Sequence, residues 1–364
     1  MILLYVFGGI VVLNCTYLIL YSRFSYFTLK DDQHKDSFPV SLIICAKNEE
    51  AHLKEFIPYW LKQDHPRYEI ILINDASTDN SLDIMESFGQ QDSRISIVDV
   101  NNNEAFWGSK KYALTLGIKQ ASYQHMIFTD ADCKPASKSW LKKISSHFSS
   151  EIQIVLGFGS YQKEQGWLNK IIRFETALTA IQYFSYAIVG IPYMGVGRNL
   201  GYTQKIFYDN RGFMLHMDIP SGDDDLFVNQ AANRDNTTVC FNKDSFTFSN
   251  PKTSWKKWLH QKKRHISTAK HYQRKHKFLL GLFYISTFLF WILAITTLLR
   301  IDWKIPLILF LSRMILYWII IGKAMKKLDQ KDLIYFFPFL EIFLLFLQLS
   351  IFISNSISKP TKWK

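Results

Sequence analysis

Cysteine is scarce in this chain, and the four cysteines lie far apart. Cys15, Cys45, Cys133 and Cys240 show no C-x-x-C spacing, so the sequence predicts neither a disulfide framework nor a zinc site, in keeping with a reducing compartment. Internal repeats and low-complexity linkers are also absent. Aromatic residues make up 16% and charged residues 20% of the 364 residues, a composition that argues against disordered and fibrous proteins.

Charge is almost absent from four stretches of the chain, residues 1–21, 278–299, 305–322 and 333–353. Their only charged side chains are Arg313 and Glu341. Each stretch is close to the roughly 20 residues that a helix needs to cross a hydrocarbon core. The rest of the chain has the charge of an ordinary soluble domain. The sequence therefore predicts a membrane protein with a large soluble part, rather than a soluble protein or a pure channel or transporter.

The first apolar stretch lacks the basic start and the small-residue cleavage site of a signal peptide, which is the alternative interpretation. Basic residues Arg23, Lys30 and Lys35 follow it. We therefore expect an uncleaved transmembrane anchor over residues 1–22, with the following chain in the cytoplasm. The prediction is a multi-pass protein of the inner (cytoplasmic) membrane whose catalytic domain faces the cytoplasm.

The C-terminal apolar stretches extend this topology. Three transmembrane helices over residues 278–354 put the connection that contains Lys323, Lys326, Lys327 and Lys331 in the cytoplasm, as the positive-inside rule requires. The last lysines, Lys359, Lys362 and Lys364, fall on the opposite side. Whether the last segment crosses fully or re-enters therefore stays open.

Acidic residues are absent from residues 252–277, which hold ten Lys or Arg and four His. We expect this segment, taken as residues 251–277, to lie along an anionic membrane surface, where each basic side chain contributes about 1 kcal/mol. Trp255 and Trp258 fit such an interface. Nucleic acid is not an expected partner, because no nucleic-acid-binding motif accompanies the charge.

Residues 38–250 alternate short apolar runs with helical patterns, which predicts an α/β domain. The expected strands, buried on both faces, are residues 40–45, 69–74, 95–100 and 125–129. The expected helices are residues 50–63, 81–89 and 110–121. Ligands in such sheets bind at the carboxyl ends of strands, so the polar residues there are the candidate site.

Carboxylates follow the predicted strands. Asp130 and Asp132 come directly after residues 125–129, and two residues apart on a continuing strand they would point to one face. Such a pair can hold a hard divalent cation and, through it, a diphosphate. The three acids at residues 223–225 should raise one another's pKa values, which suits a general base. A solvated helix N-terminus is the alternative for them.

Taken in order, these motifs resemble those of family 2 glycosyltransferases. They are Ala-Lys-Asn-Glu at 46–49, Asp-Ala-Ser-Thr-Asp at 75–79, Gly108 with Lys-Lys-Tyr-Ala-Leu at 110–114, Asp-Ala-Asp at 130–132, Gly-Asp-Asp-Asp-Leu at 222–226 and Gln-Lys-Lys-Arg-His at 261–265. The resemblance covers roughly residues 38–270. An anchor before the domain and a membrane bundle after it resemble membrane-bound members, including polysaccharide synthases and ceramide-type glucosyltransferases.

The resemblance implies a GT-A fold, a Rossmann-like nucleotide-diphospho-sugar transferase domain. It also implies a nucleotide-diphospho-sugar donor, most simply a UDP-sugar, a divalent metal (Mg²⁺ or Mn²⁺) and inversion at the anomeric carbon. The implied donor-binding residues are Glu49, Asp75, Lys110 or Lys111, and Asp130, with Asp132 and Asp130 for the metal. Asp224, or else Asp223, would be the base, and Gln261 and Arg264 would lie near the acceptor and the leaving diphosphate. Arg198, Asn199 and His265 would line the acceptor site.

The chain departs from the family pattern at two motifs. His265 replaces the Trp that ends the last motif, and the usual Glu-Asp acceptor motif is Asp-Asp here. The missing Trp and the small number of membrane segments favour transfer of one sugar to a lipid-linked or membrane-proximal acceptor. A processive polysaccharide synthase is the first alternative, and a catalytically inactive nucleotide-sugar-binding protein is the second.

Two further features concern the membrane part. Residues 167–188 are aromatic-rich but contain Lys170, Arg173 and Glu175, so we expect an interfacial amphipathic helix rather than another span. Arg313 and Glu341 each lie eight residues from the cytoplasmic end of their segments. At 1.5 Å per residue both would lie about 12 Å deep, and we expect them to pair across antiparallel helices.

Overall fold

The computed structural model describes residues 1–29, 37–100, 110–219 and 221–357. The chain divides into two units. The sheet unit comprises Leu29–Glu164, Gly190–Thr253 and Thr361–Lys364, and the helical unit comprises Met1–Thr28, Gln165–Val189 and Ser254–Pro360. Lys30, Lys35, Gly108, Lys359, Lys362 and Lys364, on which some of the predictions rest, lie outside the described residues.

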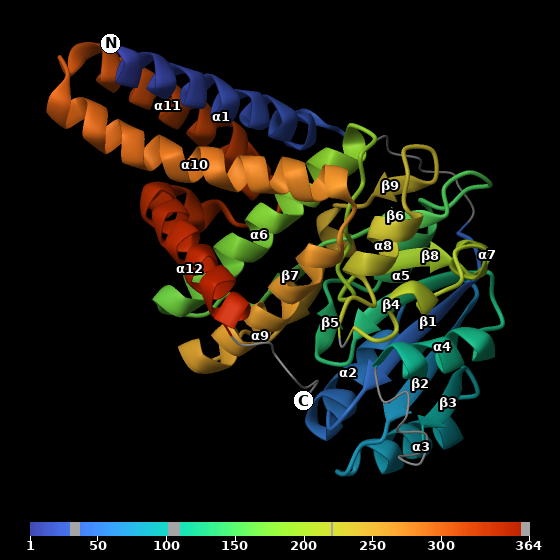
Figure 1. Ribbon diagram of the computed structural model, residues 1–364. Coiled ribbons are helices and arrows are strands. Elements are labelled where there is room, and N and C mark those ends of the chain that lie inside the picture. Colours follow the sequence, from blue (N-terminus) through green and yellow to red (C-terminus); the bar gives the residue numbers. More distant parts are fainter. Residues whose placement is uncertain (30–36, 101–109, 220, 358–364) are drawn as a thin grey trace. The chain divides into compact units, whose positions relative to one another are not determined.

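The sheet unit is built on a seven-stranded sheet of order β3-β2-β1-β4-β8-β6-β9 (Figure 1). Its parallel half consists of β1 (Val40–Ala46), β2 (Tyr68–Asp75), β3 (Ile95–Val100) and β4 (His125–Asp130). β8 (Leu200–Thr203) is antiparallel to β4 and to β6 (Ile154–Leu156), and β9 (Thr237–Val239) is parallel to β6. The parallel strands place the chain segments that follow them at one edge of the sheet.

The predicted strands all form, but one expected feature of them is wrong. β1 and β2 are buried along nearly their whole length, as expected. β3 is the last strand at the end of the sheet, and its middle residues are only partly buried or exposed. A terminal strand lies at the margin of the core, where its side chains are covered less completely, so β3 is not buried on both faces.

The helices between these strands are α2 (Glu50–Leu61), α3 (Ser81–Gln91) and α4 (Lys110–Gln120), close to their predicted bounds. α2 buries Leu53, Phe56, Ile57 and Trp60, a spacing of three and four residues that places all four on one face. They join the core with Leu42, Ile44 and other residues of β1 and β2. The remaining helices of this unit are α5 (Trp140–Ser145), α7 (Gln204–Asp209) and α8 (Asp225–Ala231).

A second, three-stranded sheet of order β5-β10-β7 completes the sheet unit. β10 (Thr247–Ser249) pairs antiparallel with β5 (Cys133–Pro135) and parallel with β7 (Gly159–Tyr161). β5 begins three residues after β4 ends. This small sheet therefore continues directly from the predicted Asp-Ala-Asp motif.

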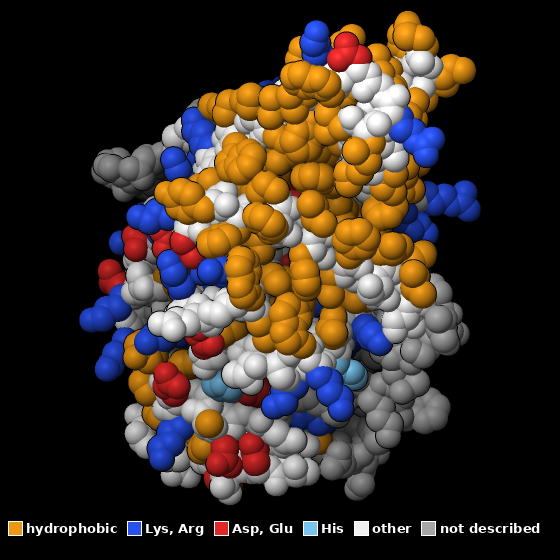
Figure 2. Space-filling model, turned by 90° about the vertical axis from the view of Figure 1, so that its left-hand side faces the viewer, with side chains coloured by type: hydrophobic (Ala, Val, Ile, Leu, Met, Phe, Trp, Pro, Cys, Tyr) orange, Lys and Arg blue, Asp and Glu red, His pale blue; other side chains and the backbone are white. Residues whose placement is uncertain are grey.

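Within the described residues, four helices of the helical unit are long and apolar enough to cross a membrane: α1 (Ile2–Tyr26), α10 (Arg274–Arg300), α11 (Lys304–Lys327) and residues Lys331–Ser354. The last of these contains most of α12 (Phe337–Ile357). They coincide with the four predicted apolar stretches. The exposed side chains of these helices include many large hydrophobic residues, and Figure 2 shows such side chains gathered into a broad apolar surface.

Helix α1 is an integral part of the helical unit. The Tyr17 hydroxyl donates to the Leu279 carbonyl over 2.7 Å, and the Ser25 hydroxyl donates to the Ile320 carbonyl over 2.8 Å. These bonds fasten α1 to α10 and α11. That α1 is an uncleaved membrane anchor stays a prediction.

The predicted helix at residues 167–188 forms as α6 (Trp167–Ile188), but it is not an amphipathic helix with one apolar face. Buried residues occur on all its sides, among them Asn169, Arg173 and Tyr183. Arg173 donates to both carboxylate oxygens of Asp332, over 2.6 and 3.0 Å, and to the Gln330 side chain over 2.7 Å. Arg173, one of the charged residues that suggested exposure to an interface, is thus buried and paired with Asp332.

The predicted pair of Arg313 and Glu341 is confirmed. The guanidinium of Arg313 on α11 donates to both carboxylate oxygens of Glu341 on α12, over 2.6 and 2.9 Å. Both side chains are almost fully buried. The Trp291 indole also donates to Glu341 over 3.1 Å. Charge this deep in an apolar bundle is therefore matched by a bidentate partner.

Candidate active site

The segments that follow β1 and β2 are joined to each other at the carboxyl edge of the sheet. The backbone N–H of Asn48 donates to the Ser77 hydroxyl over 3.0 Å, and the N–H of Thr78 donates to the Asn48 side chain over 2.8 Å. Asn48 and Ala76 both have positive φ, 55° and 50°. Non-glycine residues in this region carry strain of about 1–3 kcal/mol, which functional sites often hold.

The predicted nucleoside-contacting residues Glu49 and Asp75 lie on these two segments. Glu49 precedes α2, and its carboxylate lies 2.7 Å from Nδ1 of His52. Asp75 ends β2 and is almost fully buried. Burial raises the pKa of Asp75, while the charges of Lys47 and Lys110 oppose the shift. Both carboxylates are thus at the edge that the strand pattern predicts, and their contact with a nucleoside stays a prediction.

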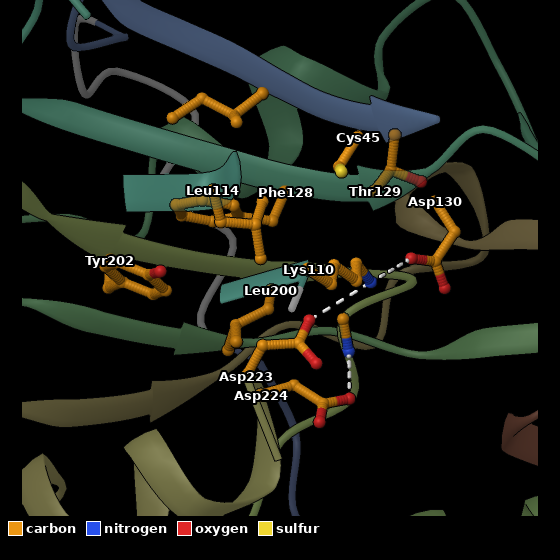
Figure 3. A pocket seen from close by; sticks show the side chains of 12 residues that line it. Cys45, Lys110, Leu114, Phe128, Thr129, Asp130, Leu200, Tyr202, Asp223 and Asp224 are labelled. Atoms are coloured by element: carbon orange, nitrogen blue, oxygen red, sulfur yellow. Dashed lines mark hydrogen bonds and ion pairs between the residues drawn. The ribbon is translucent and has the colours of Figure 1, made fainter. Parts of the chain in front are cut away.

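Lys110, the first residue of α4, joins two carboxylates from distant parts of the chain. Its Nζ lies 2.8 Å from Oδ1 of Asp130, at the end of β4, and 3.0 Å from Oδ2 of Asp223. Burial lowers the pKa of Lys110, but the two carboxylates outweigh this and hold it well above its usual range. The lysine therefore keeps its charge between Asp130 and Asp223 (Figure 3).

The adjacent Lys111 points elsewhere, which separates two residues that the sequence left as alternatives. Its side chain is 1% exposed, and Nζ donates to the backbone carbonyls of His216 over 2.5 Å and Ile219 over 2.9 Å. Burial lowers the pKa of Lys111 to about 8. Lys111 thus fastens the segment that leads to the three acids, and Lys110 is the lysine that lines the pocket.

The structure also separates the three consecutive acids. Asp223 pairs with Lys110, and Asp225 begins α8, where its carboxylate accepts from the N–H of Leu226 over 2.8 Å. Asp224 accepts the N–H of Gly197 over 2.7 Å. Burial raises the pKa of Asp224 to about 7, with further increases from Asp223 and Asp225. Asp224 is therefore the acid whose proton affinity is set near neutrality.

These side chains line one pocket at the carboxyl edge of the sheet. Its walls are formed by Ile43, Cys45, Lys110, Leu114, Phe128, Thr129, Asp130, Gly197, Leu200, Tyr202, Asp223 and Asp224 (Figure 3). Three of these residues, Cys45, Thr129 and Tyr202, were not predicted to belong to the site. Cys45 and Thr129 lie near the carboxyl ends of β1 and β4, so the strand-end pattern could have found them. Tyr202 lies on β8, whose antiparallel place in the sheet has no local signal.

Asp130 and Asp132 come together, though not as the continuing strand would place them. β4 ends at Asp130 and a turn follows. Ligand atoms of Asp130, Asp132 and Cys133 nevertheless lie within 4.8 Å of one another. Burial raises the pKa of Asp132, with contributions from Asp130 and Glu49, while Arg198 and Lys252 lower it.

This group suits a hard divalent cation. Burial holds the pKa of the Cys133 thiol well above its usual range, and its Sγ lies 3.0 Å from the Ser249 hydroxyl. Burial therefore disfavours the thiolate form of Cys133 at neutral pH. Two carboxylates without a thiolate favour Mg²⁺ or Mn²⁺ over metals that prefer sulfur.

Arg198 and Asn199, both expected to line the acceptor site, are placed differently. The guanidinium of Arg198 lies over the Tyr161 ring, 4.4 Å from its centroid. Asn199 is fully buried, donates to the carbonyls of Phe158 and Ser245 over 3.0 and 2.7 Å, and accepts from the Trp140 indole over 3.1 Å. These bonds hold Asn199 in the interior of the sheet unit, and its contact with an acceptor stays a prediction.

Gln261, Arg264 and His265 lie on α9 (Trp255–Thr268) in the helical unit. Lys262 of the same motif forms an ion pair with Glu175 of α6, and both side chains are largely buried. Trp255 packs on Phe343 of α12, with ring centroids 5.6 Å apart. α9 is thus fastened within the helical unit, and the roles of Gln261, Arg264 and His265 at the reacting centre stay predictions.

Carboxylates gathered at the carboxyl edge of a largely parallel α/β sheet are typical of a ligand-binding site in this class of fold. The family model for glycosyl transferase family 2 matches residues 41–213. This part of the chain is a family 2 glycosyltransferase domain, which confirms the predicted family.

Curated relatives match over part of their length. An uncharacterized glycosyltransferase of Haemophilus influenzae is 33% identical over 144 residues, which is 40% of this chain and 41% of the relative. Poly-beta-1,6-N-acetyl-D-glucosamine synthase of Staphylococcus epidermidis is 32% identical over 109 residues, 30% of this chain and 25% of the relative. The matched segments thus span less than half of either relative.

A solved structure extends the likeness of fold beyond the matched domain. Mannosyltransferase PcManGT from Pyrobaculum calidifontis, in complex with GDP-Man and Mn²⁺, aligns with a TM-score of 0.58 at 13% identity. The alignment covers 90% of this chain and 96% of that chain. The α/β GT-A architecture and the four apolar helices, one N-terminal and three C-terminal, are as predicted.

Proposed function

We propose that this protein is a membrane-bound inverting glycosyltransferase. It moves a sugar from a nucleotide-diphospho-sugar to a lipid-linked or membrane-proximal acceptor in the synthesis of an envelope glycan or glycolipid. The arrangement of Asp224 carries this proposal. A buried carboxylate whose pKa is raised to about 7 lies in the pocket that Asp130 also lines, so it can accept a proton at neutral pH.

The reaction follows from these positions. The acceptor hydroxyl attacks the anomeric carbon, its proton passes to Asp224, and the bond between that carbon and the diphosphate oxygen breaks. Asp224 is aimed by the N–H groups of Gly197 and Asp225, each 2.7 Å from a carboxylate oxygen. Asp130 and Asp132 would hold a divalent cation, which when bound supplies positive charge for the diphosphate. Glu49 and Asp75 are proposed to contact the nucleoside.

The four apolar helices support a membrane-proximal acceptor. We place the sheet unit at the cytoplasmic face of the inner membrane, where nucleotide sugars are made. The donor is proposed to be a UDP-sugar, and the solved mannosyltransferase bound to GDP-Man adds GDP-sugars to the set to be tested.

A processive polysaccharide synthase is the second candidate, because one relative carries the name of a polymer synthase. The length of the product distinguishes the candidates. A single added sugar supports the first, and a ladder of products supports the second.

The test of the proposed function is nucleotide release by the full chain in detergent. A panel of UDP- and GDP-sugars is supplied with Mn²⁺ or Mg²⁺ and a membrane-lipid extract. We expect release that needs both metal and lipid, and a fall of about 10²- to 10⁴-fold in Asp224→Asn, since that is the usual contribution of a general base.

Asp209→Asn is the matched control, because Asp209 is exposed and forms an ion pair with Lys205 of the same helix. It should retain wild-type release. Metal-dependent nucleotide binding without release from any donor would instead support an inactive nucleotide-sugar-binding protein.

A further inference from the structure

Arg198 follows Gly197 directly, yet the two residues have different partners. The N–H of Gly197 donates to Asp224. The Arg198 side chain turns to β7, where it lies over Tyr161 and donates to the Ser160 carbonyl over 3.2 Å. The backbone of Gly197 thus contacts Asp224, the candidate base, while the side chain of Arg198 contacts β7.

The backbone of Arg198 is held next to the donor-side carboxylates. Its carbonyl accepts the hydroxyls of Thr129, over 2.9 Å, and Thr247, over 2.8 Å. Thr129 immediately precedes Asp130 on β4. A Cβ at Gly159 would come within 2.7 Å of the Arg198 Cβ, so the absence of a side chain at Gly159 makes room for this approach.

The small sheet connects Tyr161, under the Arg198 guanidinium, to the strand that follows the candidate metal ligands. Cys133 pairs with Ser249 across β5 and β10, and Ser249 pairs with Tyr161 across β10 and β7. Tyr161, whose ring lies under the Arg198 guanidinium, is therefore about two strand spacings of ~4.8 Å each from Cys133, the residue after Asp132. Arg198 and Lys252 are also the cations whose charge acts on Asp132.

We propose that Arg198 binds the diphosphate of the donor and stabilises the charge of the leaving group. The assignment rests on the proposed function and moves Arg198 from the acceptor to the donor. A guanidinium fits phosphate oxygens with two parallel hydrogen bonds. Its stacking on Tyr161 and the two threonine bonds fix its position before the donor arrives, as charge stabilisation in a transition state requires. The cation also belongs to the same unit as Asp130, Asp132 and Asp224.

The test compares diphosphate and monophosphate nucleotides by calorimetry on the full chain in detergent with Mn²⁺. UDP is compared with UMP, and GDP with GMP. In Arg198→Gln we expect affinity for the diphosphate to fall about 10-fold or more, the usual effect of losing a charged hydrogen bond. Affinity for the monophosphate should stay unchanged. Arg198→Lys keeps the charge without the fork, so its loss should be smaller.

The matched control is Arg94→Gln. The Arg94 guanidinium lies 4.9 Å from the centroid of the Tyr68 ring and donates hydrogen bonds to Asp92. Arg94 is therefore also an arginine stacked on a tyrosine, but it lies at the amino end of the strands, away from the site. It should bind both nucleotides as the wild type does. The thermal unfolding midpoint of Arg198→Gln, compared with that of Arg94→Gln, checks that the pocket is folded.

Three results would overturn the assignment. Unchanged diphosphate affinity in Arg198→Gln, with or without a rise in the KM for the lipid acceptor, would return Arg198 to the acceptor side. Equal loss for the diphosphate and the monophosphate would place it on the nucleoside or the first phosphate. If the wild type binds none of these nucleotides with Mn²⁺, the proposed function itself fails, and this assignment fails with it.

Discussion

At the scale of single residues, side chains that are adjacent in the sequence have different partners in this site. Lys110 joins Asp130 to Asp223, while Lys111 bonds to backbone carbonyls. Gly197 aims Asp224, and Asn199, two residues later, is bonded inside the core. The chemistry of each position is thus set by the direction of its side chain and by partners from distant segments.

The raised pKa of Asp224 predicts how activity depends on pH. A general base must be deprotonated to act, so turnover should rise with pH through a midpoint near the value of about 7. The charged groups that act on Asp224 are Asp223 and Asp225, which raise its pKa, and Lys110, which lowers it. The measurement is donor turnover at saturating substrate across the neutral pH range.

Asp223→Asn tests the origin of this midpoint. Removing the Asp223 charge removes a repulsion that disfavours ionised Asp224 and leaves Lys110 with one carboxylate fewer, so the midpoint should move to lower pH. A midpoint that stays in place would show that Asp223 does not set the proton affinity of the base. Asp209→Asn, with its remote exposed carboxylate, should leave the profile unchanged.

At the scale of elements, the position of Lys110 depends on how closely α4 approaches the sheet. A Cβ at Gly117 of α4 would lie 2.3 Å from Cδ1 and 2.9 Å from Cγ1 of Ile73 on β2. Glycine in a helix interior ordinarily costs stability relative to alanine. Here the missing side chain allows the helix to pack against the strand.

Gly117→Ala should therefore destabilise the sheet unit by about 1–3 kcal/mol, the usual cost of overpacking. Ile73→Val removes the nearer carbon, so the double variant should recover part of the loss. The measurement is the midpoint of thermal unfolding of the full chain. Gly281→Ala on α10 is the control, because a Cβ there would meet no atom within 4 Å; it should not lower the midpoint. Equal stability of wild type and Gly117→Ala would contradict the close packing.

Much of this element pattern could be predicted locally. The parallel strands and the helices between them have apolar runs and spacings that identify them within a few residues. β3 differs in burial because its place at the end of the sheet is a property of the whole sheet. The charges of α6 predict an interfacial helix, but their partners lie far along the chain. Arg173 contacts Asp332 and Gln330, and Glu175 pairs with Lys262.

At the scale of the whole molecule, the helical unit depends on the buried pair of Arg313 and Glu341. Asn14 of α1 lies 3.4 Å from the Arg313 guanidinium, and the rings of Phe290 and Tyr317 lie 4.6 Å from it. The pair thus connects α1, α10, α11 and α12 at one point. A bidentate pair in an apolar bundle fixes the register of the helices on which it lies.

Glu341→Gln should destabilise this bundle by about 3–5 kcal/mol, because it leaves the Arg313 charge buried without its counter-ion. The combination of Glu341→Gln with Arg313→Met should be less harmful than Glu341→Gln alone, since no unpaired charge remains. The measurement is the fraction of protein that stays monodisperse in detergent after heating. A single variant as stable as the wild type would show that the pair does not stabilise the bundle.

The sequence by itself determined the apolar spans, the parallel strands and the carboxylates at their ends, because these depend on patterns within one segment. It also indicated the Arg313–Glu341 pair, because depth in a membrane can be counted along each helix. Only the tertiary structure decided which of Lys110 and Lys111 faces the pocket, which of the acids at 223–225 accepts the N–H of Gly197, and that Arg198 lies over Tyr161. Adjacent residues point in different directions, and their charges are set by groups that only folding brings within a few ångströms.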